Sequence, residues 1–376
     1  MNKNNFCSLP FTEIFLGPDG GIKTCCSSRE NIGNLNEQKI EDILLSPNAK
    51  RIRQNIINGT WDPACAQCQR QEIQNVSSER SLIFHDSFKN LSNEYFNLKR
   101  LDLRWSNTCN LSCVYCYEYF SSKWAMIKGI KVNTLKDENE QDFIEYVERN
   151  KTTVENIMML GGEPLLQKQN VNLLDVIPNS SVYILTNLAV PLENNPLSHK
   201  LILYKNVHYA VSFETVGTRF EYVRHGADWS VFNNNLEYLK NNVENFTVDI
   251  HALYSPYSAF NLVEFYEYIL EKKLFKSVFW SLLTSSGENS SVFDTLLIPS
   301  LRLLAIKEIE KCEVLFPGEI GIDALTDIKN LLIYRKPGDG NTPRMLQELG
   351  SVESKLNKQP GKKFQDLWPD VYKELT

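Results

Sequence analysis

The stretch at residues 105–117 reads W-S-N-T-C-N-L-S-C-V-Y-C-Y and closes a strand-like run, Leu98–Trp105. It places Cys109, Cys113 and Cys116 in the order C-x3-C-x2-C within one loop. Three thiolates can hold three irons of a cubane iron–sulfur cluster and leave the fourth iron without a protein ligand. A fourth cysteine in the loop would have closed the cluster into an electron carrier. An open iron can instead bind a substrate or a cofactor.

Zinc is the alternative metal for a cysteine-rich loop. Structural zinc sites use four ligands, typically as two C-x2-C-like pairs. The loop at residues 105–117 offers three cysteines and a single pair of that kind. The spacing therefore favours an iron–sulfur cluster over a zinc knuckle.

The triad resembles the cluster motif of the radical S-adenosylmethionine (SAM) superfamily, in which an aromatic residue usually precedes the third cysteine. Tyr115 holds that position here, and the resemblance makes it a candidate contact of the cofactor. The resemblance implies a [4Fe–4S] cluster whose open iron is chelated by the amino and carboxylate groups of SAM. It also implies reductive cleavage of SAM to a 5′-deoxyadenosyl radical, with an external flavodoxin-like or ferredoxin-like electron donor.

Short β-branched runs alternate with longer amphipathic runs from Phe96 to about Ser285, the pattern of βα units and a parallel sheet. An α/β fold is predicted, and the resemblance implies a partial (β/α)6 TIM-like barrel. The triad would follow its first strand, at the carboxyl edge where barrel enzymes carry their chemistry. The predicted strands are Leu98–Leu103, Asn156–Leu160, Ser181–Thr186, Val207–Phe213, Phe246–Leu253 and Ser277–Leu283, with helices such as Glu138–Glu148 and Val231–Asn241 between them.

The second and third predicted strands end in candidate cofactor contacts. Gly161, Gly162, Glu163 and Pro164 follow the second strand; glycines let a backbone approach a ligand closely, and the proline stiffens the exit. Alone, this tetrapeptide is typical of an ordinary turn, but it resembles the family segment that binds the SAM amino group. Asn187 ends the third strand, where the family often has a Thr-Asn pair near the cofactor. Capping of a turn is an equally good interpretation of Asn187.

Ser212 and Glu214 lie at the end of the fourth predicted strand, and Arg224 follows ten residues later. A serine or acidic group at that position can hydrogen-bond ribose hydroxyls, and an arginine can hold a carboxylate through two hydrogen bonds. By resemblance, Ser212 and Arg224 would contact the ribose and the carboxylate of SAM. Glu214 and Thr215 stand where many relatives have Asp-Gly, which leaves the role of Glu214 less defined. An arginine at a helix start is also typical of a protein surface.

A second set of cysteines precedes the barrel. The stretch ending at Cys25 resembles the Gly-x4-Cys hairpin of the twitch and SPASM auxiliary-cluster domains, and Cys65 and Cys68 form a C-x2-C pair. With Cys7 they make four thiolates, enough to close a second [4Fe–4S] cluster. A zinc site of four thiolates would have the same spacing. Cys26 is left over, because the hairpin spacing favours Cys25. The resemblance implies one auxiliary cluster that transfers electrons, in a domain that more commonly follows the barrel.

Three domains are predicted: a cysteine-rich, twitch-like cluster domain at residues 1–95, the barrel at 96–300 and a helical extension at 301–376. The Lys-rich piece Lys355–Lys363 is expected to be a solvated face or a linker. The other elements predicted outside the barrel are helical stretches at Ile40–Ile57, Thr60–Phe84 and Leu303–Leu315, a turn at Gly338–Asn341 and a short element at Lys363–Leu375.

Composition narrows the class of protein. The chain has 376 residues, of which 42% are hydrophobic and 23% charged, as in soluble globular proteins. Its formal charge of −6 lacks the basic footprint of a nucleic-acid binder. No apolar run approaches a membrane span, and no signal-peptide core follows Met1–Asn5. We expect a cytoplasmic protein with neither nucleic-acid nor membrane partners, whose nine cysteines serve metal or redox chemistry rather than disulfides.

The five histidines are scattered, and no two have metal-ligand spacing. His251 and Tyr254, at the end of the fifth predicted strand, would either touch the substrate or pack in the core. Cys312 is expected to be a small buried residue of a helix.

These features predict a radical SAM enzyme that abstracts hydrogen from a peptide or from a small, sugar-like molecule, with an auxiliary cluster for electron transfer. The alternative is an iron–sulfur electron-transfer or scaffold protein that does not turn over SAM.

Overall fold

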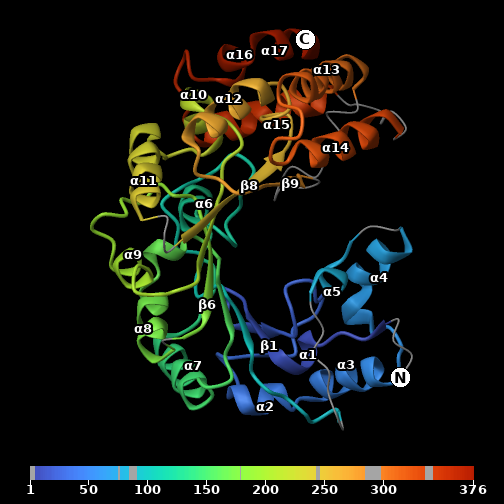
Figure 1. Cartoon of the computed structure of the whole chain (residues 1–376), viewed down its shortest axis with the longest axis vertical. Helices are drawn as coiled ribbons and strands as arrows, with labels where there is room; N and C mark the ends of the chain where they lie inside the picture. Colours follow the sequence, from blue (N-terminus) through green and yellow to red (C-terminus); the bar gives the residue numbers. More distant parts are fainter. Residues whose placement is uncertain are drawn as a thin grey trace. The chain divides into compact units, whose positions relative to one another are not determined.

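The computed structural model describes residues 5–74, 77–83, 91–177, 179–242, 246–283, 298–334 and 342–376, and Figure 1 shows the course of the chain. Its contacts divide the chain into two compact units. Unit 1 comprises Met1–Asn107 and Val132–Ile184, and unit 2 comprises Thr108–Lys131 and Leu185–Thr376. The predicted turn at 338–341, His85 and the last residue of the predicted helix Thr60–Phe84 lie outside the described residues. The three predicted domain boundaries stay predictions.

Unit 1 is built on a sheet with the strand order β3-β2-β1-β4-β5-β6. Strands β1, β4, β5 and β6 are parallel, whereas β2 and β3 are antiparallel to their neighbours. The bounds are β1 (Glu13–Leu16), β2 (Gly21–Lys23), β3 (Gly33–Asn34), β4 (Arg100–Leu103), β5 (Asn156–Met159) and β6 (Ser181–Thr186). Strand β1 is not among the strands predicted from the sequence. It joins the amino-terminal segment to the first predicted barrel strand, with Glu13 beside Arg100.

Strands β5 and β6 bury every second residue, as strands with one face packed on helices do, whereas β1 is buried throughout and the last three residues of β4 are buried. Leu101 and Leu103 of β4 are fully buried, and helices α7 (Asp137–Arg149) and α8 (Lys168–Val176) supply apolar side chains. Trp105, just after β4, packs edge-on against Phe143 of α7 and donates a 2.8 Å hydrogen bond to Asn170 of α8. These contacts fix the end of β4, from which the cysteine loop departs.

The two long amino-terminal helices predicted from the sequence are broken into shorter ones. Ile40–Ile57 becomes α2 (Ile40–Leu44) and α3 (Pro47–Ile57), because Pro47 has no N–H to continue a helix and Ser46 caps the next one. Between Thr60 and Ile83 the described elements are all short, as is α1 ahead of β1. They are α1 (Leu9–Thr12), the 3-10 turn η2 (Pro63–Cys65), α4 (Ala66–Ile73) and α5 (Glu79–Leu82).

Unit 2 contains the parallel strands β7 (Val207–Val211), β8 (Phe246–Tyr254) and β9 (Val278–Leu282). All six strands predicted for the barrel form, and their ends differ from the predicted ones by no more than two residues. The helices between them are α6 (Ser122–Lys128), α9 (Pro196–Leu201), α10 (Gly217–Val223), α11 (Trp229–Asn241) and α12 (Leu262–Lys272).

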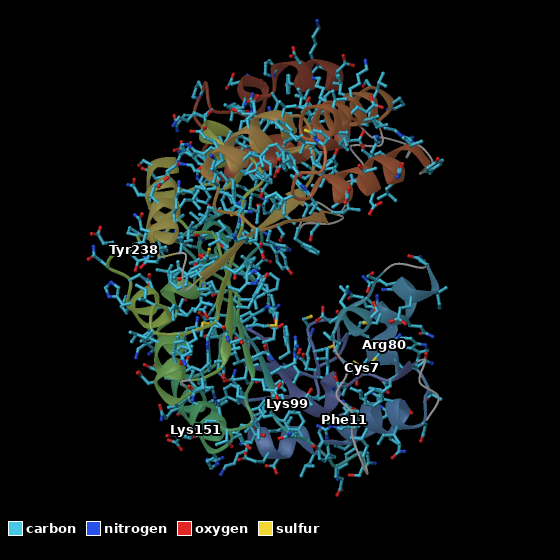
Figure 2. All side chains as sticks on the ribbon, viewed as in Figure 1. Cys7, Phe11, Arg80, Lys99, Lys151 and Tyr238 are labelled. Carbon is cyan, nitrogen blue, oxygen red and sulfur yellow. The ribbon has the colours of Figure 1, made fainter. Side chains whose placement is uncertain are left out.

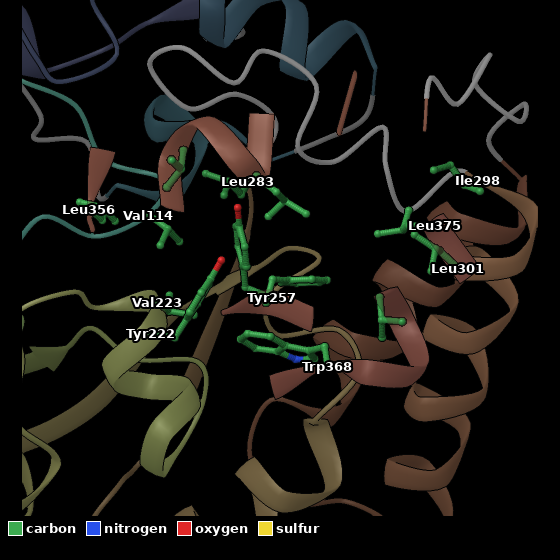
Figure 3. Close-up of a cluster of buried hydrophobic side chains, with 14 of the residues drawn as sticks. Val114, Tyr222, Val223, Tyr257, Leu283, Ile298, Leu301, Leu356, Trp368 and Leu375 are labelled. Atoms are coloured by element: carbon green, nitrogen blue, oxygen red, sulfur yellow. The ribbon is translucent and has the colours of Figure 1, made fainter. Parts of the chain in front are cut away.

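The carboxyl-terminal part of unit 2 is helical (Figure 1, orange to red). Its helices are α13 (Pro299–Leu315), α14 (Ile322–Tyr334), α15 (Thr342–Lys355), α16 (Phe364–Leu367) and α17 (Pro369–Leu375), and Cys312 is fully buried in α13. Helices α13, α15, α16 and α17 share an apolar cluster with the loop after Cys113, the end of α10 and Tyr257. Figure 3 shows Tyr222, Tyr257 and Trp368 gathered in this cluster, together with Val114 and Val223. None of the described helices in either unit combines the length and apolarity that crossing a membrane requires.

Two carboxylates are buried where β1 meets β4. Glu13 is 4% exposed and lies 3.1 Å from Arg100, and Asp102 is 1% exposed and lies 2.8 Å from Arg104. Burial raises the pKa of Glu13 to about 8, and the charge of Asp102 adds to the effect, although Arg100 opposes both. Glu13 therefore holds a proton in the folded protein at pH values where the unfolded chain has lost it.

Glu13 is expected to make stability fall as the pH rises. Its pKa is about 4.5 in the unfolded chain and about 8 in the folded one, so the stabilisation is complete below pH 4.5 and is lost as the pH rises through 8. We expect a loss on the order of 2 kcal/mol between pH 5 and pH 8. Glu13→Gln should flatten this profile and be the more stable protein at pH 8. The free energy of unfolding is measured by urea unfolding at several pH values. An equal fall with pH in wild type and variant would contradict this prediction.

Candidate functional site

The predicted cluster loop lies in unit 2, where the sulfurs of Cys109 and Cys113 face nitrogen donors and that of Cys116 lies 3.7 Å from the carbonyl oxygen of Tyr117. The sulfur of Cys109 accepts a 3.4 Å hydrogen bond from the backbone N–H of Leu111 and a 3.9 Å contact from Asn187 Nδ2. Burial raises the pKa of the Cys113 thiol, and the charge and hydrogen bonding of the Arg224 guanidinium oppose this shift. Donors of this kind stabilise thiolates rather than neutral thiols. The loop therefore fits cysteines that ligate a metal, such as the three that would hold a [4Fe–4S] cluster.

Helix α6 holds the cluster loop in place. Ser121 caps the helix, and its hydroxyl donates to the carbonyl of Leu111 at 2.7 Å. The hydroxyl of Ser122 accepts from the backbone N–H of Cys109 at 3.1 Å. The indole of Trp124 donates to the carbonyl of Cys113 at 2.9 Å. The residues just after the triad thus fix the backbone of two predicted ligands, a role that sequence analysis did not assign to them.

Tyr115, Glu214 and Arg224 form a buried network beside Cys113. The hydroxyl of Tyr115 donates to one Glu214 oxygen at 2.8 Å, and Arg224 donates to the other at 2.7 Å. Arg224 is 6% exposed and Glu214 is 1% exposed. The guanidinium also lies over the Tyr115 ring, 5.4 Å from its centroid. Three side chains that the sequence assigned separately to SAM binding are therefore in contact with one another.

The network fixes the protonation of its members. Burial alone would lower the pKa of Arg224, but Glu214, Tyr115 and Cys113 raise it above its ordinary value. Burial and the Glu214 carboxylate raise the pKa of Tyr115 well above its ordinary value, although Arg224 opposes them. Arg224 is thus a permanent cation and Tyr115 a permanent donor. The Nε of Arg224 is buried and has no hydrogen-bond partner among the described residues, so a ligand carboxylate could satisfy it.

Asn187 serves both interpretations that the sequence left open. Its carbonyl oxygen accepts from the backbone N–H of Ala189 at 2.8 Å, which is a local turn. Its amide donates to Asn110 at 3.0 Å and approaches Cys109. Ser212, just after β7, is half-buried, and its backbone N–H donates to the carbonyl of Thr186 at 2.9 Å. Contacts of either residue with SAM stay predictions.

The Gly-Gly-Glu-Pro segment, residues 161–164, lies in unit 1. Gly161 has φ of +110°, and a Cβ on it would lie 3.2 Å from the Cα of Arg104, so a side chain would be strained. The backbone N–H of Gly162 donates to the carbonyl of Ser106 at 3.3 Å. Glu163 is fully buried and accepts from the backbone N–H of Leu165 at 3.1 Å, and Pro164 starts the 3-10 turn η3 (Pro164–Leu166). The segment is therefore a rigid turn, and its role in SAM binding stays a prediction.

His251 and Tyr254, the histidine and tyrosine predicted at the end of the fifth barrel strand, face opposite sides of β8. Tyr254 is fully buried, so it belongs to the core. His251 is half-buried, stacks on the exposed ring of Phe279 and lies 3.4 Å from the hydroxyl of Ser281. Contact of His251 with a substrate stays a prediction.

A cavity in unit 1 is lined by all four cysteines predicted for the auxiliary cluster: Cys7, Cys25, Cys65 and Cys68. Cys26 is exposed and is not among the described residues that line it. Arg80, labelled beside Cys7 in Figure 2, lines the same cavity.

The chemistry of this cavity suits a group bound by several thiolates. Burial raises the pKa of the Cys7 thiol, and charges on Cys65 and Cys68 would raise it further. Such thiols ionise only when a cation compensates them, so metal binding and deprotonation are coupled. Among the described residues, no three His, Cys, Asp or Glu side chains are grouped as ligands of a single metal ion. A cubane cluster requires a wider spacing, because each thiolate binds a different iron.

Arg224→Ala is expected to destabilise the fold as well as SAM binding. The sequence suggested an accessible arginine, but the structure buries it against Glu214, and its removal would leave an uncompensated buried carboxylate at a cost of about 3 kcal/mol. The double variant Arg224→Met, Glu214→Gln removes both charges and keeps an acceptor for Tyr115. It should regain most of the stability but not the SAM affinity. Wild-type SAM affinity in a folded double variant would exclude Arg224 as the carboxylate ligand.

Two protein-family models match the parts of the chain that contain the two cysteine sets. Residues 7–69 match the family described as an iron–sulfur cluster-binding domain, SPASM, and residues 103–269 match the radical SAM superfamily. A 7-carboxy-7-deazaguanine synthase from Clostridium acetobutylicum is 39% identical over 89 residues, which cover 23% of this chain and 36% of that protein. The chain thus spans about a third of the length of this relative.

Two solved structures show weaker similarity. Streptococcus suis SuiB bound to S-adenosylmethionine aligns with a TM-score of 0.42 and 15% identity, over 73% of this chain and 63% of that one. The protein anSMEcpe with bound AdoMet and Cp18Cys peptide aligns with a TM-score of 0.36 and 17% identity, over 57% of this chain and 65% of that one. At these TM-scores the likeness alone establishes nothing.

The two family matches fall on the two cysteine sets in the predicted order. The SPASM match begins at Cys7 and includes Cys25, Cys65 and Cys68, and the radical SAM match includes the triad and four of the six predicted barrel strands. The fold class is therefore the predicted one, an α/β partial barrel preceded by a cluster-binding domain. The chain therefore contains a radical SAM domain, preceded by an iron–sulfur cluster-binding domain of the SPASM family.

Proposed function

We propose that this protein is a radical SAM enzyme that abstracts hydrogen from an unreactive C–H bond of a peptide or of a small, sugar-like molecule. The observation that carries the proposal is the contact between Cys113, Arg224, Glu214 and Tyr115, which sets a fixed cation and an unsatisfied donor beside a predicted cluster ligand. An electron carrier with no small-molecule site has no use for that donor.

The residues of the site bind and orient the cofactor. Arg224 presents its free Nε to a carboxylate, while Glu214 holds the guanidinium in one orientation. Asn187 and the N–H of Leu111 direct hydrogen bonds at the sulfur of Cys109. When bound, the cluster and SAM supply the 5′-deoxyadenosyl radical. The apolar cluster around Val114 and Tyr222 keeps water away from the other side of the loop.

The substrate class is proposed only as far as the relatives suggest it. A solved structure of SuiB is bound to precursor peptide SuiA, and the structure of anSMEcpe contains Cp18Cys peptide. The relative from Clostridium is a synthase of a deazaguanine, a small molecule. A peptide substrate and a small-molecule substrate are therefore both retained, together with an external electron donor of the flavodoxin or ferredoxin type.

The experiment is SAM cleavage by anaerobically reconstituted wild-type protein. With dithionite and SAM, we expect 5′-deoxyadenosine and methionine in equal amounts by liquid chromatography and mass spectrometry. Deuterium transfer from labelled candidate peptides or sugars into 5′-deoxyadenosine would then identify the substrate class. If the protein carries both iron–sulfur clusters but never cleaves SAM, the alternative function applies, that of an iron–sulfur electron-transfer or scaffold protein.

A further inference from the structure

In unit 2, the segment Tyr222–Gly226 lies against the cluster loop and is hydrogen-bonded to it. The backbone N–H of Ser112 donates to the carbonyl of His225, and that of Val114 donates to the carbonyl of Val223, both at 2.9 Å. Gly226 has φ of +99°, and a Cβ on it would lie 3.4 Å from the carbonyl oxygen of Asn110. Because Arg224 lies in the middle of this segment, whatever positions the segment also positions Arg224 and the backbone around Cys113.

Lys358, beyond the end of α15, holds this segment from behind. Its Nζ donates to the carbonyl of Tyr222 at 2.8 Å and to Nδ1 of His225 at 2.9 Å, and it lies 4.6 Å from the centroid of the Tyr222 ring. The preceding residue, Asn357, has φ of +50°, a left-handed conformation that turns the chain there. A lysine expected to be a solvated residue is thus a half-buried one with two defined acceptors.

The charges around Lys358 are consistent with these contacts. Burial lowers the pKa of Lys358 to about 8, and the charge of Lys362 also lowers it. The charges of Glu353, Cys113 and Glu221 oppose this shift. Burial and the Lys358 charge lower the pKa of His225 to about 4. His225 is therefore neutral at pH 7, and its Nδ1 can accept the hydrogen bond from Lys358.

Glu353 of α15 provides a second attachment to the same segment. Its carboxylate accepts from the hydroxyl of Tyr222 at 3.0 Å and from the backbone N–H of Phe364 at 2.6 Å. Leu356 and Phe364 also pack in the apolar cluster with Val114 and Tyr222 (Figure 3 labels Leu356). Glu353 and Lys358 are thus connected to the cluster loop through the segment Tyr222–Gly226.

We propose that Lys358 is a positioning residue of the SAM site: it holds Tyr222–Gly226 against the cluster loop and so fixes Arg224 and Cys113 for cofactor binding. This inference rests on the proposed function for its SAM readout, but its structural part can be measured without cofactor. The carboxyl-terminal extension then belongs to the active site in function, although its residues are not proposed to touch the cofactor.

The test compares Lys358→Met, Lys358→Arg and, as a matched control, Lys362→Met, which removes an exposed lysine from the same Lys-rich piece. In apo-protein, amide hydrogen exchange at Ser112 and Val114 should rise about tenfold in Lys358→Met and stay at the wild-type rate in Lys362→Met. In reconstituted protein, Lys358→Met should weaken SAM binding about tenfold. The SAM-induced change in the electron paramagnetic resonance spectrum should be smaller at equal SAM concentration. Lys358→Arg, which keeps a cation and donors, should restore most of each loss.

Wild-type exchange at Ser112 and Val114 in Lys358→Met would overturn the proposal, as would a loss of SAM affinity that Lys362→Met shares or that Lys358→Arg does not restore. If Lys358→Met fails to fold, Lys358→Gln, which keeps one donor without the charge, replaces it in the same comparison. A wild-type protein that does not bind SAM defeats the proposed function, whereas the exchange measurement still decides the role of Lys358 in holding the loop.

Discussion

Replacement of Cys109, Cys113 and Cys116 by alanine is expected to abolish 5′-deoxyadenosine formation and to lower the iron content from about eight to about four atoms per chain. The three thiols are the only predicted protein ligands of the open cluster, and two of their sulfurs receive the hydrogen bonds that stabilise thiolates. Without them SAM has no iron to chelate. Iron analysis, the visible absorption spectrum and chromatography of the products measure the three consequences.

Cys312→Ala is the control for this experiment, because Cys312 is buried in α13 and belongs to neither predicted ligand set. It should keep the full iron content and SAM cleavage. A triple variant that retains eight irons would show that the triad does not bind the cluster. A triple variant that still releases 5′-deoxyadenosine would place SAM cleavage elsewhere.

Replacement of Cys65 and Cys68 by alanine is expected to remove the other half of the iron and to leave SAM cleavage in place. These two cysteines line the unit 1 cavity, and with Cys7 and Cys25 they complete four thiolates that leave no iron free for a ligand. A site of that kind transfers electrons and does not bind SAM. If the reaction is a net oxidation, oxidised product should disappear while 5′-deoxyadenosine persists.

Cys26→Ala is the control, since Cys26 neighbours Cys25 but is exposed. Metal binding contributes to the folding of small cluster domains, so circular dichroism and thermal unfolding must accompany the assay. Zinc in the remaining site of the triad variant would refute the iron assignment of the amino-terminal cysteines. Full formation of oxidised product by a folded variant without the second cluster would leave that cluster a structural role.

The barrel strands could be predicted because their signals are local. Each is a β-branched run bounded by turn residues. The order of apolar and polar residues within the run indicates whether both faces or only alternate residues are buried. Strand β1 could not be predicted, because a run of four residues carries little pattern. What makes Glu13–Leu16 a strand is its pairing with Arg100–Leu103, far away in the sequence.

The cofactor contacts were predicted from motif resemblance, and their environment was not. Arg224 was expected at a surface or an accessible site, yet a glutamate ten residues earlier buries it. Lys358 lies in a run of lysines, which locally indicates a solvated face, and only the fold brings it to His225. Long polar side chains are therefore the residues for which sequence reasoning failed here, because their burial depends on partners that no local pattern reveals.

The parallel pairing of β1 with β4 also bears on how the chain assembles during synthesis. Glu13 and Arg100 are 87 residues apart, so β1 leaves the ribosome several seconds before its partner at typical rates of about 5–20 residues per second. Until β4 emerges, β1 can pair with β2 but not with β4. The edge of β1 that later pairs with β4 therefore keeps its backbone groups unpaired. The amino-terminal cysteines are made first, but the sheet that carries their hairpin is completed only later. Order of synthesis and order of assembly therefore differ, and a truncation that keeps residues 1–95 alone would trap the chain at that open edge.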